Sequence, residues 1–239
     1  MPSHSARLRA KIDLTLPAMR ATTRRLWCSP DLAVLYPRYL VLMHTLIRAT
    51  VPLMEVALGA ADRLASGPQA DVVAAGVAEY LTRHIREERG HDEWLRQDLA
   101  ALDLDPGQLL NVMPSPATAA VVGSQYYWAL HYHPVCLLGH IAVLEGYPAD
   151  PRLADVIAER TGYPQTAMRT LIRHSALDVR HRDELMAAID ALPLTEAHSA
   201  AMGISALHTM QYLLDIFDEL ISSHDNRITT GIRWEVVLG

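Results

Sequence analysis

The sequence contains few cysteines and no surplus of positive charge. Its 239 residues include two cysteines, Cys28 and Cys136, which are far apart and form no C-x-x-C pair. This usage argues against a disulfide framework or a cysteine-rich zinc site, and it favours a cytoplasmic location. The 27 acidic residues outnumber the 21 basic ones, giving a formal net charge of −6. A nucleic-acid surface needs clustered Lys and Arg, so we expect no nucleic-acid partner.

Several common segments and motifs are also missing. No apolar run approaches the roughly 20 residues of a membrane span, and no apolar segment follows the basic run from Ser5 to Lys11. We therefore expect neither a membrane partner nor a secretory signal. The sequence has no Gly-rich dinucleotide fingerprint, no Walker loop and no nucleophile elbow. Half of the residues are hydrophobic (50%) and 20% are charged, which is typical of a soluble globular protein.

Apolar residues recur at helical spacing along most of the chain, and Gly and Pro separate the segments. The expected helices cover residues 6–27 (where Pro17 can cause a break), 35–64, 71–102, 117–131, 135–145, 151–161, 166–191 and 196–223. No alternation with period two persists, so the predicted fold class is all-α. We expect one domain over residues 1–239, with 1–30 as an N-terminal helical arm and 225–239 as an extended tail.

Two of these helices carry histidines and carboxylates on one face. In the first, Glu88 and His91 are three residues apart, and His84 lies four residues before Glu88. In the second, His174, Asp178 and His181 are spaced four and then three apart, so their side chains point the same way. Each set alone is also compatible with a solvated polar face. Imidazoles and carboxylates together favour iron or manganese.

A further acid, Glu145, follows the apolar run 135–144. An acid at the end of so apolar a helix is expected to be buried and to need a partner. With it, the candidate metal ligands are Glu88, His91, Glu145, His174, Asp178 and His181. Six ligands suit two metal ions, and three carboxylates with two divalent ions leave a formal charge of about +1. His84 is a further candidate, either as a ligand or as a donor to one.

Two di-iron architectures can use these residues. A ferritin-like bundle takes one Glu from each of two helices and Glu-x-x-His from two more, which here recruits Glu55 and leaves His174 unexplained. The alternative rests on a resemblance. Residues 87–95 with Asp98-Leu99, the segment from Gly123 through His133-Pro134 to Gly146, and His174 to His181 resemble three regions of the haem-oxygenase-like di-iron oxidases and oxygenases, also called iron-containing redox enzymes.

The resemblance covers about residues 35–220 and implies a bundle of about seven helices without haem. It also implies a centre of two Fe(II) ions, held by the six ligands named above, that reacts with dioxygen as co-substrate. In some members the first His lies seven residues after the Glu; here that position is Leu95, so the chain follows the Glu-x-x-His branch.

Our hypothesis from the sequence is therefore a non-haem di-iron oxidase or oxygenase. Its substrate would be a small amino acid, amine or carboxylic acid, undergoing N-oxygenation, oxidative C–C cleavage or decarboxylation. Arg173 and Arg180 neighbour the second ligand set, and either could bind a substrate carboxylate. Manganese in place of iron stays open, as do a ferritin-like iron-handling role, a haem-binding or haem-degrading role and a metal-free binding module. A homodimer is expected by analogy alone.

Overall fold

The computed structural model describes residues 2–109 and 111–225, and every element in these ranges is helical. The predicted all-α fold class is confirmed. The helices are α1 (His4–Asp13), α2 (Leu16–Trp27), α3 (Leu32–Ala65), α4 (Val72–Glu88), α5 (His91–Ala100), α6 (Pro106–Leu109), α7 (Pro116–His131), α8 (Cys136–Leu144), α9 (Leu153–Thr161), the 3-10 turn η1 (Gln165–Met168), α10 (Arg169–Ala191) and α11 (Glu196–Asp225). Apart from Asp225, the expected extended tail lies outside the described residues.

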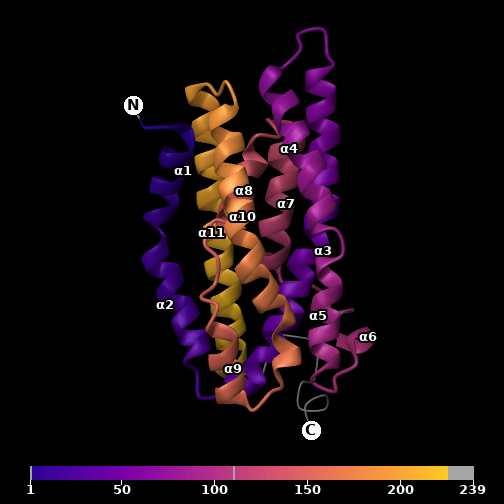
Figure 1. Cartoon of the computed structure of the whole chain (residues 1–239), viewed down its shortest axis with the longest axis vertical. Coiled ribbons are helices and arrows are strands. Elements are labelled where there is room, and N and C mark those ends of the chain that lie inside the picture. The colour runs from indigo at the N-terminus through magenta and orange to yellow at the C-terminus, as the bar shows by residue number, and fades with distance from the viewer. Residues whose placement is uncertain (1, 110, 226–239) are drawn as a thin grey trace.

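The helices form an elongated bundle whose longest members, α3, α10 and α11, run along its long axis (Figure 1). On one side α1 and α2 follow each other along α11, and on the other α3 packs against α4, α5 and α7. The short helix α8 lies inside, in contact with α7, α10 and α11. This packing brings the ends of α4 and α8 to the middle of α10.

The first expected helix divides into two. α1 ends at Asp13, and α2 begins at Leu16 with Pro17 in its first turn. Proline is tolerated there because the first N–H groups of a helix have no intrahelical partner. The break anticipated near Pro17 is therefore confirmed, and it lies just before the proline.

α3 is long and apolar enough to cross a membrane by length and composition alone. Its 34 residues include an 18-residue window with a mean hydropathy of 1.4, of which 33% is buried. The expectation that no segment approaches the length of a span was therefore wrong. The core helix of a soluble protein meets the same criterion, and α3 is the helix against which α4, α5 and α7 pack.

The single helix expected over residues 71–102 is also wrong, because the chain breaks at Gly90. α4 ends at Glu88, Arg89 is extended, and Gly90 has φ +90° and ψ 6°. A left-handed backbone of this kind is strained for residues with a Cβ and free for glycine. Glu88 and His91 thus end one helix and begin the next, so they do not share the face of a continuous helix.

Two apolar clusters fill the bundle, one towards each end. The first includes Val77 and Leu81 of α4 and Leu185 of α10, and the second includes Leu95 of α5 and Met168 before α10. Residues 84–91 and 174–181 carry predicted ligands. In the sequence, each of these segments lies between residues of the first cluster and residues of the second. The bundle therefore carries a polar layer between its two apolar halves.

Candidate metal centre

Buried imidazoles and carboxylates converge in this polar layer. One group consists of His84, Glu88, Glu145 and His181, and the other of Glu88, His91 and His174. Within each group, one potential ligand atom from every residue lies within 4.8 Å of the others. Glu88 belongs to both groups. Two donor groups that share one carboxylate are the arrangement needed to hold two neighbouring cations.

The turn at Gly90 brings Glu88 and His91 together from two helices. Glu88 is the last residue of α4 and His91 the first of α5, yet Glu88 Oε2 and His91 Nδ1 are 3.1 Å apart. His91 also lies beside α10, with its ring centroid 5.2 Å from that of His174. The break therefore turns His91 towards α10 while Glu88 stays at the end of α4.

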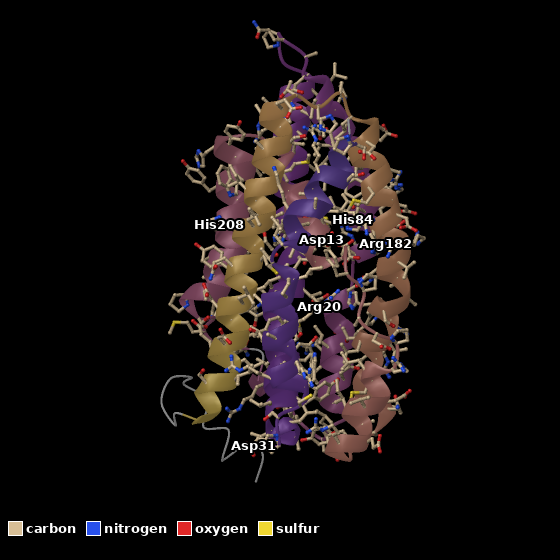
Figure 2. The ribbon with its side chains drawn as sticks, turned by 90° about the vertical axis from the view of Figure 1, so that its left-hand side faces the viewer. Asp13, Arg20, Asp31, His84, Arg182 and His208 are labelled. Atoms are coloured by element: carbon tan, nitrogen blue, oxygen red, sulfur yellow. The ribbon has the colours of Figure 1, made fainter. Side chains whose placement is uncertain are left out.

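Glu145 follows the last residue of α8 and is buried, as its sequence context predicted. Its Oε1 accepts a hydrogen bond from His84 Nε2 at 3.0 Å, and its Oε2 lies 3.4 Å from His181 Nδ1. Figure 2 places His84 inside the bundle near the ribbon of α10, and its ring centroid is 5.0 Å from that of His181. The partner expected for this buried acid is thus a pair of histidines.

α10 supplies the three remaining predicted ligands. His174 Nδ1 lies 3.1 Å from the carbonyl oxygen of Thr170, one turn earlier, and donates its proton there. This bond leaves His174 Nε2 as the nitrogen that can bind a cation. His181 is 1% exposed, and Asp178 is buried as well. Asp178 belongs to neither donor group, although the charges of Glu145 and Glu88 act on its carboxyl group.

The pKa directions show how much negative charge is crowded into this layer. Burial, followed by the charge of Glu145, raises the pKa of Asp178 to about 8. Burial alone would also raise the pKa of Glu145, but contacts with His181 and His84 outweigh it and lower the pKa. The contact with Glu145 raises the pKa of His181 in turn. A cation placed here would reduce the repulsion between the carboxylates.

The residues fit a metal centre by a second criterion, since many of their polar atoms are buried without a hydrogen bond. These atoms are Glu87 Oε2, Glu88 Oε1, His91 Nδ1, Glu145 Oε2, Asp178 Oδ1 and His181 Nδ1. Leaving a buried polar atom unsatisfied costs about 1–3 kcal/mol, so such atoms rarely gather without a function. All six can donate an electron pair to a cation, and oxygen and imidazole donors without thiolate suit iron or manganese.

The structure also shows which of the candidate residues other than the six predicted ligands lie at the centre. His84 lies within the first donor group, and its sequence signal was its position one helical turn before Glu88. Glu55, which the ferritin-like alternative needs, is instead half exposed and paired with Arg89 at 2.9 Å. His44, His140 and Cys136 are all buried, but none of them belongs to either donor group. Of these residues, only His84 joins the centre.

Comparisons with known proteins agree with this geometry. Residues 62–213 match the family model described as iron-containing redox enzyme. The chain belongs to this family. The resemblance expected from the sequence is thus confirmed, and the protein is an iron-containing redox enzyme at the level of its family. None of the curated proteins matches the chain.

Two solved structures share the fold. One is a domain of unknown function with a heme oxygenase-like fold from Shewanella denitrificans OS217, with a TM-score of 0.75, 18% identity, and coverage of 91% of this chain and 90% of that one. The other is a TenA homolog from Pseudomonas syringae pv. tomato strain DC3000, with a TM-score of 0.69, 16% identity, and coverage of 90% and 92%. The predicted haem-oxygenase-like fold is therefore confirmed. At these identities the likeness concerns the fold alone.

Proposed function

We propose that this family member is a non-haem di-iron oxygenase or oxidase acting on a small organic substrate. The observation that carries the proposal is the pair of buried donor groups sharing Glu88. A single cation would not use both groups. Two divalent cations would satisfy the buried donor atoms that have no hydrogen bond and would balance the charges of Glu88, Glu145 and Asp178.

The two donor groups indicate which residues would bind each of the two ions. Glu145 and His181 would hold one ion and His91 and His174 the other, with Glu88 available to both. Asp178, which shares a face of α10 with His181, would join the first ion by turning its carboxylate towards it, and His84 would either join that ion or orient Glu145 through their hydrogen bond. When bound, two ferrous ions would supply electrons that reduce dioxygen, and the substrate would be oxidised by the dioxygen so activated. Manganese in one position fits the same donors.

The protein itself contributes burial and orientation. The two apolar clusters on either side of the layer exclude water from the donors. His174 is held by its bond to the Thr170 carbonyl, so the direction of its free nitrogen is fixed before a cation binds. We extend the proposal to a small molecule as the organic partner, a cytoplasmic location and, by analogy, a homodimer.

Two of the three rival functions, the ferritin-like and the haem-binding roles, meet specific difficulties. A ferritin-like site needs Glu55, whose carboxylate is turned outward to Arg89. A haem iron needs one proximal imidazole and would leave the buried carboxylates Glu88, Glu145 and Asp178 without a cation. The di-iron proposal uses all of these buried acids.

An anaerobic Fe(II) titration tests the proposal, with bound iron counted per chain. The parent should bind two ions, His91→Ala and His174→Ala should lose one, and Glu88→Ala should lose most of both. Glu55→Ala is the matched control and should still bind two. Undiminished iron in the two histidine variants would refute the proposed ligands. Iron loss in Glu55→Ala would favour the ferritin-like site, and a Soret band after haem addition would favour a haem protein.

A further inference from the structure

The donor cluster is open to solvent mainly at one residue. Of the six predicted ligands and His84, His174 alone is half buried, while the other six are buried. His174 belongs to the group with His91 and Glu88, which also has fewer donors than the other group. A substrate arriving from solvent would therefore meet the His91–His174 side first.

Trp94 of α5 flanks these two histidines. Its ring stacks on His91 with the ring centroids 4.0 Å apart, and it lies edge-on to His174 at 5.6 Å. His91 and Trp94 are three residues apart, which is about one helical turn, so both side chains emerge on the same side of α5. The indole therefore forms one wall of the exposed side of the cluster.

The guanidinium of Arg173 lies over this indole. Its Cζ is 4.6 Å from the centroid of the Trp94 ring, a cation–π distance. Arg173 is exposed, and no carboxylate pairs with it among the residues that the structure describes. Stacking on Trp94 restrains the long side chain while its N–H groups stay available. An uncompensated cation is thus held beside the open side of the His91–His174 pair.

Arg180, the other arginine near the second ligand set, already pairs with acidic side chains. Its Nη1 lies 3.1 Å from Glu87 Oε1 and 3.5 Å from Glu184 Oε1. A substrate carboxylate would have to compete with both acids for it. Of the two arginines that the sequence offered, the structure leaves only Arg173 free of an acidic partner.

We propose that Arg173, stacked on Trp94, recognises a carboxylate of the organic substrate at the exposed side of the His91–His174 pair. This inference rests on the proposed function and deepens it by naming the substrate class, a small carboxylic or amino acid. The planar guanidinium matches a carboxylate with two parallel hydrogen bonds. Arg173 acts on specificity and takes no part in bond breaking.

Calorimetric titration with acetate, hexanoate and benzoate tests the inference, with hexan-1-ol as the uncharged counterpart of hexanoate. Metal-free and anaerobic Fe(II)-loaded proteins are both titrated. Arg173→Gln should weaken binding of the carboxylates about 10–100-fold, the range for a hydrogen bond to a charged group, and leave hexan-1-ol unchanged. Arg173→Lys should restore part of the loss, because it keeps the charge without the planar fork.

Arg83→Gln is the matched control, since Arg83 is also exposed and lies over an aromatic ring, that of Tyr80, at 5.9 Å. It should leave carboxylate affinity unchanged. An equal loss in both variants, an unchanged affinity in Arg173→Gln, or no carboxylate binding by the parent would each overturn the inference. Iron is counted in the same samples: binding of fewer than two ions refutes the di-iron proposal, while the metal-free titrations still report on Arg173.

Discussion

The carboxylate of Asp98 on α5 accepts the backbone N–H of Thr170 at the start of α10, with 2.9 Å between Oδ2 and N. Its other oxygen accepts the N–H of Arg169 at 3.1 Å. Asp98 is 0% exposed, so α5 supplies the cap that α10 does not provide for itself. Because α5 carries His91 and α10 carries His174, this contact helps fix the position of one histidine relative to the other.

Removal of this cap should lower stability. Asp98→Ala leaves two backbone N–H groups without their acceptor and should reduce the free energy of unfolding by about 3 kcal/mol, measured by urea unfolding of the metal-free protein. Asp98→Asn keeps one acceptor oxygen and should lose less. Glu93→Gln, at an exposed acid of the same helix, should stay within about 0.5 kcal/mol of the parent. Equal effects at Asp98 and Glu93 would contradict this role of the cap.

Helical spacing predicted most of the bundle and five of the six residues in the two donor groups at once, because the period of 3.6 residues is visible in the sequence itself. It did not predict the break at Gly90. Leu81, Ile85 and Leu95 continue the apolar pattern across the turn, so the sequence reads as one helix while the backbone turns at a single glycine.

The contacts between helices were harder to predict than the helices. Glu145 was expected to be buried, but the sequence does not show that His84 would reach it, because their 61-residue separation is closed only by tertiary packing. Asp178 shares a helix face with His174 and His181 and yet falls outside both donor groups. Likewise, the choice between Arg173 and Arg180 depends on Trp94 and Glu87, which come from other helices.

Metal loading should stabilise the protein. Several buried oxygen and nitrogen atoms of the donors lack hydrogen bonds, and burial and neighbouring charge raise the pKa of Asp178 to about 8, so the folded state gains more from a cation than the unfolded chain does. Fe(II) at about 100 times its Kd should contribute roughly 2.7 kcal/mol, which corresponds to a rise in Tm of about 5–10 °C. The measurement is anaerobic thermal unfolding before and after EDTA. Glu88→Ala should show little rise, and an equal rise in that variant would place the cation elsewhere.

Acidification should destabilise the protein through His140, outside the donor cluster. Burial lowers the pKa of His140 to about 4, although the charge of Glu145 acts to raise it, and Nδ1 of His140 bonds Thr209 Oγ1 at 3.0 Å. The folded state thus holds a neutral imidazole that the unfolded chain protonates below about pH 6.5. This contribution is complete above pH 6.5 and is lost as the pH falls towards 4, by roughly 3 kcal/mol.

The measurement is the free energy of unfolding of metal-free protein at several pH values between 4 and 7. His140→Gln should flatten the slope in this interval, because its amide can still bond Thr209 but does not titrate. The exposed His131 provides the control, and His131→Gln should leave the slope unchanged. An unaltered slope in His140→Gln would assign the acid sensitivity to other groups.

Gly90 and Gly123 form a matched pair that separates backbone strain from crowding. A Cβ at either position would meet nothing within 4 Å, but Gly90 has φ +90° whereas Gly123 lies within α7. Gly90→Ala should therefore destabilise the protein by about 1–2 kcal/mol through backbone strain alone, while Gly123→Ala should stabilise it by about 0.5–1 kcal/mol. Because Gly90 lies between Glu88 and His91, Gly90→Ala should also weaken iron binding, measured by Fe(II) titration. If Gly90→Ala were as stable as the parent, the left-handed turn would not be what separates α4 from α5.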